Sequence, residues 1–261
     1  MEYKPKNINL IFAFLSGLIL LFIMGPLLGM LLDTPAVSIF DAAKEKEVRD
    51  SIGLTLGASF FGTLFFAIAA IPFAYLLARK EFRFKRLISG IIDIPVVIPH
   101  SAAGIAILGF VSRDSIIGGA ADSMGFSLVG HPIGIAIAMA FVSLPYLINA
   151  ARNGFEAVPV RLEKAALNLG ASSFKMFFSI SLPLAWRNIL SGLIMMFARG
   201  MSEFGAVVII AYHPMTTPVM IFERFGAFGL KYAQPVAIIF IAISLIVFIF
   251  LRWLSGKNIH A

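Results

Sequence analysis

The chain has 261 residues, of which 59% are hydrophobic and only 13% are charged, and its mean hydropathy is +0.93. Soluble domains carry about 25% charged residues, so this composition excludes an ordinary soluble domain and predicts an all-α polytopic membrane protein. The absence of cysteine excludes a disulfide framework, thiol catalysis and cysteine metal sites. A net charge of +7 could indicate a nucleic-acid partner. The way these charges are distributed favours a membrane orientation instead, and we expect no nucleic acid.

Six apolar segments are each long enough to span a hydrocarbon core. They cover residues 10–32, 51–78, 87–111, 132–150, 185–211 and 235–253. The first has 23 residues without a charge. It is too long for a signal-peptide core of about 7–15 residues, so we expect it to be retained as a membrane span. We therefore expect a first span with an external loop in residues 1–50, a helical domain in residues 51–254 and a tail in residues 255–261.

Lysine and arginine in the loops predict the orientation, because cytoplasmic loops carry the excess of these residues. One side of the predicted topology holds fourteen of them and the other side holds six, with Arg199 inside a span. The side with fourteen includes both termini, the loop after the second span and the loop after the fourth. These segments are therefore predicted to be cytoplasmic.

The loop after the fourth span contains a short amphipathic helix and a turn. Pro159 can open this helix and Gly170 can close it in the left-handed conformation. Apolar residues recur at helical spacing along one stripe, namely Leu162, Ala165, Ala166 and Leu169. The other side is predicted to be polar, with Arg161, Glu163, Lys164 and Asn168. Ser172 or Ser173 can then cap a second short helix, which we expect Pro183 to end.

The spacing of Ala165-Ala166, Gly170, Phe177, Ile180 and Leu182-Pro183 resembles the "EAA" loop of the permeases of ABC importers. In that family the loop forms a coupling helix that docks into a cleft of the ATPase subunit. The resemblance implies this role for residues 155–183, and for Glu163, Lys164, Ala165, Ala166, Leu169, Gly170 and Pro183 in particular. The chain departs from the family at one position, because alignment on Gly170 places Lys164 where the glutamate usually stands. This departure puts a charge-pairing role for the glutamate in question. The alternative is an ordinary amphipathic surface hairpin.

The fifth predicted span carries two ionisable residues, Arg199 and Glu203, which would share one face of a helix at i and i+4. An ionisable residue inside a membrane costs at least about 2.5 kcal/mol, so it usually faces protein or water and has a partner. This face either lines the transport route or holds the bundle together as an internal ion pair. Gly200 and Gly205 leave room for a neighbouring helix.

The third predicted span is interrupted by the sequence DIPVVIPH, which includes Asp93, Pro95, Pro99 and His100. Two prolines four residues apart remove backbone donors, so we expect the helix to be broken or kinked here. The break is either a gate in a transport route or a static kink. For His100, a hydrogen-bonded structural role is favoured over a role as an anion ligand.

Several chemistries lack their motifs in this sequence. It contains no GxxxxGK[ST], GxSxG or HExxH, and its four histidines lack metal-ligand spacing. We therefore predict that the chain is not an enzyme, binds no cofactor or metal, and relies on a separate ATPase.

Three longer stretches resemble the molybdate/tungstate permease group. They are DIPVVIPHSAAGIAIL, FVSLPYLINAARNGFEAV and ARGMSEFGAVVIIAYHP. The last block is shared in looser form with sulfate and thiosulfate permeases, which makes sulfate the second substrate candidate. The resemblance implies a type I importer fold in the cell membrane. It also implies two copies of this chain, two ATPase subunits and an external binding protein that delivers the oxyanion.

Two other classes remain as alternatives. A secondary transporter driven by an ion gradient would use intramembrane carboxylates, for which Asp93 and Glu203 are candidates. An intramembrane serine protease would need a base such as His100 beside Ser101 or Ser143.

Overall fold

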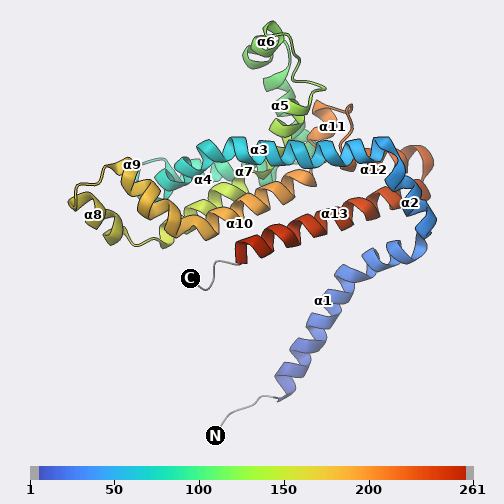
Figure 1. Cartoon of the computed structure of the whole chain (residues 1–261), viewed down its shortest axis with the longest axis horizontal. Coiled ribbons are helices and arrows are strands. Elements are labelled where there is room, and N and C mark those ends of the chain that lie inside the picture. Colours follow the sequence, from blue (N-terminus) through green and yellow to red (C-terminus); the bar gives the residue numbers. More distant parts are fainter. Residues whose placement is uncertain (1–5, 257–261) are drawn as a thin grey trace.

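The computed structural model describes residues 6–256, and this part of the chain is helical throughout apart from short connections (Figure 1). The long helices are α1 (Lys6–Asp33), α3 (Lys46–Arg79), α7 (Pro132–Ala157), α10 (Leu182–Met201) and α13 (Leu230–Gly256). The shorter ones are α2 (Ala36–Lys44), α4 (Lys85–Val97), α5 (His100–Val111), α6 (Ile116–Ser123), α8 (Val160–Asn168), α9 (Ser173–Met176), η1 (Phe177–Ser181), α11 (Val207–Ile210) and α12 (Thr217–Phe228). Residues 257–261 of the predicted tail lie outside this description.

The predicted membrane spans correspond to helices in the structure. Five continuous helical segments of the described chain are long and apolar enough to cross a bilayer, and the α4–α5 pair brings the number to six if it forms one span. The predicted spans and the observed helices agree because a segment that crosses lipid must satisfy its backbone hydrogen bonds internally, and a helix does so. Long runs without charge therefore predict helices.

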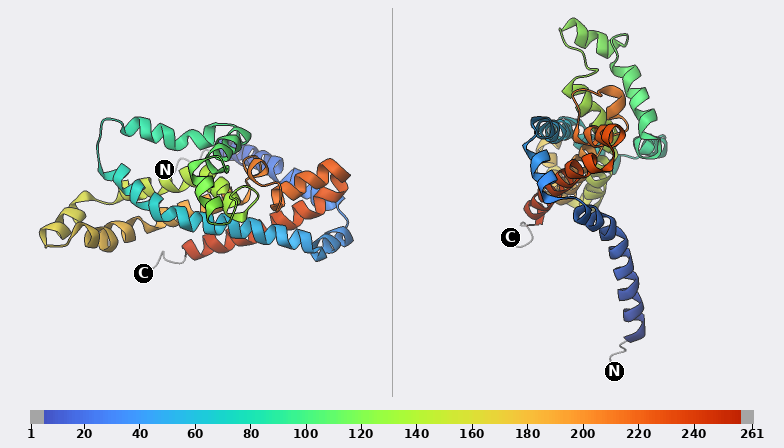
Figure 2. Two further views of the ribbon diagram at one scale, coloured as in Figure 1. Left: turned by 90° about the horizontal axis from the view of Figure 1, so that it is seen from above. Right: turned by 90° about the vertical axis from the view of Figure 1, so that its right-hand side faces the viewer.

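Helices α3, α7 and α10 lie side by side and form the centre of the bundle (Figure 1). Small residues allow the close approach. A Cβ added at Gly192 of α10 would stand 2.8 Å from the Cβ of Ala150 on α7. Helix α13 pairs with α12 and borders α10, whereas α1 extends away from the bundle (Figure 2). None of the most apolar window of α1 is buried. These exposed apolar side chains are suited to lipid or to another membrane chain.

The predicted break in the third span is present between α4 and α5. The chain bends by 111° between the two helices, across Ile98 and Pro99. Ile98 is extended because a residue before proline is pushed out of the helical region, and Pro99 then caps α5. Pro95, by contrast, lies inside α4 without ending it.

The fifth span differs from the prediction at both ends. Residues 173–201 form one continuous helix. The prediction that Pro183 ends a helix is therefore wrong. The π-helical turn η1 precedes Pro183, and a π turn supplies the altered hydrogen bonding that a proline in a helix requires. At the other end, α10 stops at Met201 instead of continuing to residue 211. Glu203 therefore lies in a turn before α11 and not on the same helix as Arg199.

Candidate functional site

The loop of residues 155–183, which we call the docking loop, has the geometry that its turn residues predict. Pro159 directly precedes α8, and Gly170 has φ +85° just after its last turn. The Gly170 N–H donates to the Leu167 carbonyl and the Ala171 N–H donates to the Ala166 carbonyl, which is a Schellman motif. Ser172 caps α9 by accepting from the Lys175 N–H. These caps give α8 defined ends and present it at one end of the molecule (Figure 1).

The apolar stripe of α8 faces outward. We call Leu162, Ala165, Ala166 and Leu169 the docking stripe. Leu169 is 89% exposed and Leu162 is 41% exposed, while Ala165 is exposed and Ala166 is half-buried. Lys164 is exposed beside it. A small-residue stripe that no part of the described chain covers offers a close approach to a partner backbone.

Glu163 does not lie on an exposed polar side, as the helical pattern had predicted; it is buried. Its carboxylate accepts two hydrogen bonds from Arg79 Nε, at 3.0 and 2.9 Å, and one from Arg79 Nη2 at 2.9 Å. Ser181 Oγ donates to the same carboxylate at 2.6 Å. The periodicity argument failed here because a charged residue with a complete set of partners can be buried against the bundle.

A second group of ionisable side chains meets at the break between α4 and α5. We call His100, Arg199 and Glu203 the ion cluster. Glu203 Oε2 lies 2.8 Å from His100 Nδ1 and 2.9 Å from Arg199 Nη2, and its Oε1 accepts from the Ala206 N–H at 2.9 Å. The Glu203 side chain is fully buried, whereas Arg199 and His100 are 21% and 38% exposed. A buried carboxylate needs such partners, and here the arginine neutralises it.

Glycines allow close packing at the ion cluster and beside it. A Cβ at Gly205 would stand 2.7 Å from the His100 Cβ, and one at Gly200 would stand 2.6 Å from Ser59 Oγ on α3. The sequence predicted this use of both glycines. The resulting cluster joins the start of α5 to the end of α10.

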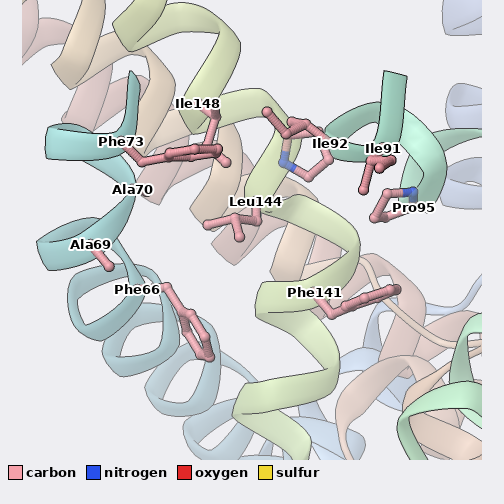
Figure 3. Close-up of a pocket in the computed structure, with 11 residues that line it drawn as sticks. Phe66, Ala69, Ala70, Phe73, Ile91, Ile92, Pro95, Phe141, Leu144 and Ile148 are labelled. Carbon is pink, nitrogen blue, oxygen red and sulfur yellow. The ribbon is translucent and has the colours of Figure 1, made fainter. Parts of the chain in front are cut away.

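Of the other candidates for a transport route, Asp93 and Pro95 lie on α4, apart from the ion cluster, whereas Pro99 lies at the break, directly before His100. Asn149 Nδ2 donates to Asp93 Oδ1 at 2.7 Å, which links α4 to α7. Pro95 lines an apolar cavity of about 340 Å³ together with residues of α3 and α7 such as Phe66 and Leu144 (Figure 3). These apolar walls suit a hydrocarbon chain or an apolar helix better than an oxyanion.

The serines considered for a protease are not paired with a base. Ser143 is buried and donates to the Met139 carbonyl at 2.6 Å. The ring nitrogens of His100 face Glu203 and Arg199. This geometry gives no support to a serine nucleophile.

Sequence reasoning missed the two residues that hold Glu163. Arg79 is 84 residues away from Glu163, and it was counted only as one of the positive charges of its loop. Ser181 lies in the stretch that was expected to form a separate short helix. One signal was available in the sequence. Glu163 stands one position before the place of the motif's glutamate, and one residue along a helix changes the direction of a side chain by about 100°.

Comparison with known proteins decides the family. Residues 70–259 match the family described as "Binding-protein-dependent transport system inner membrane component". The chain belongs to this family. This permease is 44% identical to a molybdate/tungstate transport system permease protein of Pyrococcus abyssi, over 84% of this chain and 82% of the relative. It is 41% identical to the protein of the same name in Methanocaldococcus jannaschii, over 90% and 92% of the two chains. A probable sulfate transport system permease protein of Chlorokybus atmophyticus is 30% identical over 78% of this chain and 73% of the relative.

The fold of the permease is shared with solved ABC importers. A bacterial ABC transporter involved in the import of the acidic polysaccharide alginate has a chain that superimposes with a TM-score of 0.73, at 17% identity and over 97% of both chains. The permease therefore has the all-α fold of ABC importer permeases and is a multi-pass component of the inner membrane.

Proposed function

We propose that this permease imports molybdate or tungstate as the membrane subunit of an ATP-driven, binding-protein-dependent transporter. The observation that carries the proposal is the identity of 41–44% over most of the chain with archaeal permeases named for these two anions. The relative named for sulfate is 30% identical, so sulfate stands second.

The proposed assembly has two copies of this chain, two ATPase subunits and an external binding protein. In support, the outward-facing docking stripe of α8 offers a small-residue surface that suits a cleft of another protein. ATP hydrolysis belongs to the separate ATPase, and this chain contributes the route and the surface on which force acts. The excess of lysine and arginine supports a cytoplasmic position for this loop and for both termini.

The ion cluster and the α4–α5 break are proposed to border the transport route. Passage requires weak binding, because a site that held a dianion tightly could not release it. Neutralisation of Glu203 by Arg199 supports this role, since a bare buried carboxylate would repel an oxyanion.

Reconstitution tests the proposal. The permease, its ATPase and its binding protein are placed in vesicles, all ion gradients are collapsed, and uptake of molybdate, tungstate and sulfate is measured with and without ATP. We expect ATP-dependent uptake of molybdate or tungstate that excess sulfate inhibits weakly. Uptake that follows an imposed gradient and ignores ATP would show a secondary transporter, and uptake of sulfate alone would reassign the substrate.

A further inference from the structure

The coupling helix α8 has an unusual attachment to the bundle. Glu163 is its only buried residue. None of its apolar residues belongs to the buried hydrophobic clusters of the described chain. Its apolar side chains point outward instead, toward a partner. A hydrophobic core therefore does not hold α8 in place.

The contacts of Glu163 and its partner Arg79 link α8 to the ends of three membrane helices. Arg79, at the last turn of α3, contacts Glu163 with Nε and Nη2, and the same Nη2 donates to the Val158 carbonyl at the end of α7. Ser181, in η1 at the entrance to α10, donates to Glu163 Oε1. One helical turn before Arg79, the ring of Tyr75 packs edge-on against two other rings. Its centroid lies 5.2 Å from that of Phe155 and 5.0 Å from that of Phe177.

The contact between Arg79 and Glu163 is shielded from solvent and directional. The side chains of Arg79 and Glu163 are only 11% and 7% exposed, so solvent screens the pair little. The planar guanidinium fixes direction as well as distance, because it makes parallel hydrogen bonds that a lysine cannot reproduce. Removal of one partner would leave the other charge buried without compensation.

Without this contact, α8 would be connected mainly through its two flanking turns. The turn at Pro159 and the turn at Gly170 join it to α7 and α9, and its backbone also lies beside α9 and η1. Such turns can change their dihedral angles when a load is applied. A displacement of the docking stripe would then bend the loop before it moved the spans.

We propose that Arg79, Glu163 and Ser181 are positioning residues that make α8 move as one body with α3 and α10. The inference rests on the proposed function and adds the link between docking and transport. The docking stripe does not include these three side chains. Their loss therefore lowers transport per ATP hydrolysed while the ATPase still binds.

The test uses the reconstituted complex and two measurements on each variant, co-purification with the ATPase and the ratio of anion imported to ATP hydrolysed. The variants are Glu163→Gln, Arg79→Lys and Ser181→Ala. We expect each to retain the ATPase and to lower the transport ratio, by about fivefold or more for Glu163→Gln and by less for Ser181→Ala. The matched control is Glu81→Gln, the same change of carboxylate to amide in the connection between α3 and α4; the Glu81 side chain pairs with Lys85 but is 87% exposed, so its loss should leave the ratio unchanged.

The outcomes separate the inference from the proposed function. An unchanged ratio in variants that bind the ATPase overturns the inference. If Glu163→Gln fails to assemble, the milder Arg79→Lys and Ser181→Ala variants decide by the same ratio. Loss of ATPase binding in Ser181→Ala also overturns it, because the site would then serve docking. A wild-type complex that hydrolyses ATP without importing any oxyanion contradicts the proposed function itself.

Discussion

His100 and Glu203 are 103 residues apart in the sequence, and their side chains meet with 2.8 Å between Nδ1 and Oε2. Arg199 completes the ion cluster from the last turn of α10. The Glu203 side chain has no access to solvent, and these two side chains are its ionic partners.

Glu203→Gln should destabilise the permease by about 3–5 kcal/mol, because it leaves the Arg199 guanidinium without its partner in a mostly buried position. The double change with Arg199→Gln should cost less than this single change. Thermal unfolding in detergent measures both. Asp122→Asn provides the control, since its pair with Arg113 is exposed on both sides and should contribute less than about 1 kcal/mol. Additive losses in the double-mutant cycle would show that the two residues do not interact.

Ala166→Arg should block docking of the ATPase. A long charged side chain on the docking stripe prevents the close backbone approach, so we expect association to weaken by about tenfold or more. The membrane fold should remain intact because Ala166 lies outside the buried clusters. Co-purification with the ATPase is the measurement, and Asn168→Arg, on an exposed position outside the stripe, is the control. Normal recovery of the ATPase with Ala166→Arg would contradict the docking assignment.

Gly170→Ala should loosen the end of α8. Gly170 has φ +85° and no atom within 4 Å of an added Cβ, so the cost is conformational and not steric. A cost of about 1 kcal/mol is expected for a non-glycine residue in this region. Faster hydrogen exchange or proteolysis within residues 158–172 would report it. Gly226→Ala is the matched control, because Gly226 lies inside α12 with equally open space and alanine there should stabilise the helix. Equal effects of the two changes would refute the argument.

Gly200→Ala should destabilise the packing of α10 on α3. The added Cβ would lie 2.6 Å from Ser59 Oγ, which itself donates to the Phe197 carbonyl at 2.7 Å. Overpacking of this kind costs about 1–3 kcal/mol. Addition of Ser59→Ala removes the clashing oxygen and leaves its Cβ at an ordinary 3.5 Å, so the double variant should recover part of the lost thermal stability. A double variant less stable than Gly200→Ala alone would argue against this contact.

The absence of cysteine allows a direct test of orientation. Leu169→Cys and Lys44→Cys place single thiols at positions 89% and 78% exposed. Leu169 directly follows α8 and Lys44 ends α2, and these two helices lie at opposite ends of the molecule (Figure 1). A membrane-impermeant maleimide added outside intact cells should label the thiol at position 44 and not the one at position 169. Labelling at position 169 would place the docking loop outside the cell and would overturn the proposed mechanism.

The membrane spans and the docking loop could be predicted because their signals are local. An uncharged run of 23 residues or a proline and a glycine at the two ends of a short helix needs no information from distant parts of the chain. The break before His100 was predicted for the same reason, since a proline acts on its immediate neighbours.

Long-range partners could not be predicted in this way. The pairing of Glu163 with Arg79 depends on how α3, α7 and α10 pack, and no spacing in the sequence encodes it. The pairing of Arg199 with Glu203, by contrast, was predicted, but for a reason that does not hold. The expected helical spacing was wrong, because α10 ends at Met201, yet the two side chains still meet. Local propensity also failed at Pro183, where the π turn accommodates a residue that was expected to stop the helix.

The uninterrupted helix from Ser173 to Met201 has a mechanical consequence. Its 29 residues correspond to a rod of about 43 Å at 1.5 Å per residue, with the cap of α9 at one tip and Arg199 near the other. If the helix tilts by a few degrees about its α9 end, the end that carries Arg199 moves by a few ångströms, unless the π turn absorbs the bending. The chain thus contains a single lever between the surface where a motor would act and the ionic group deep in the bundle.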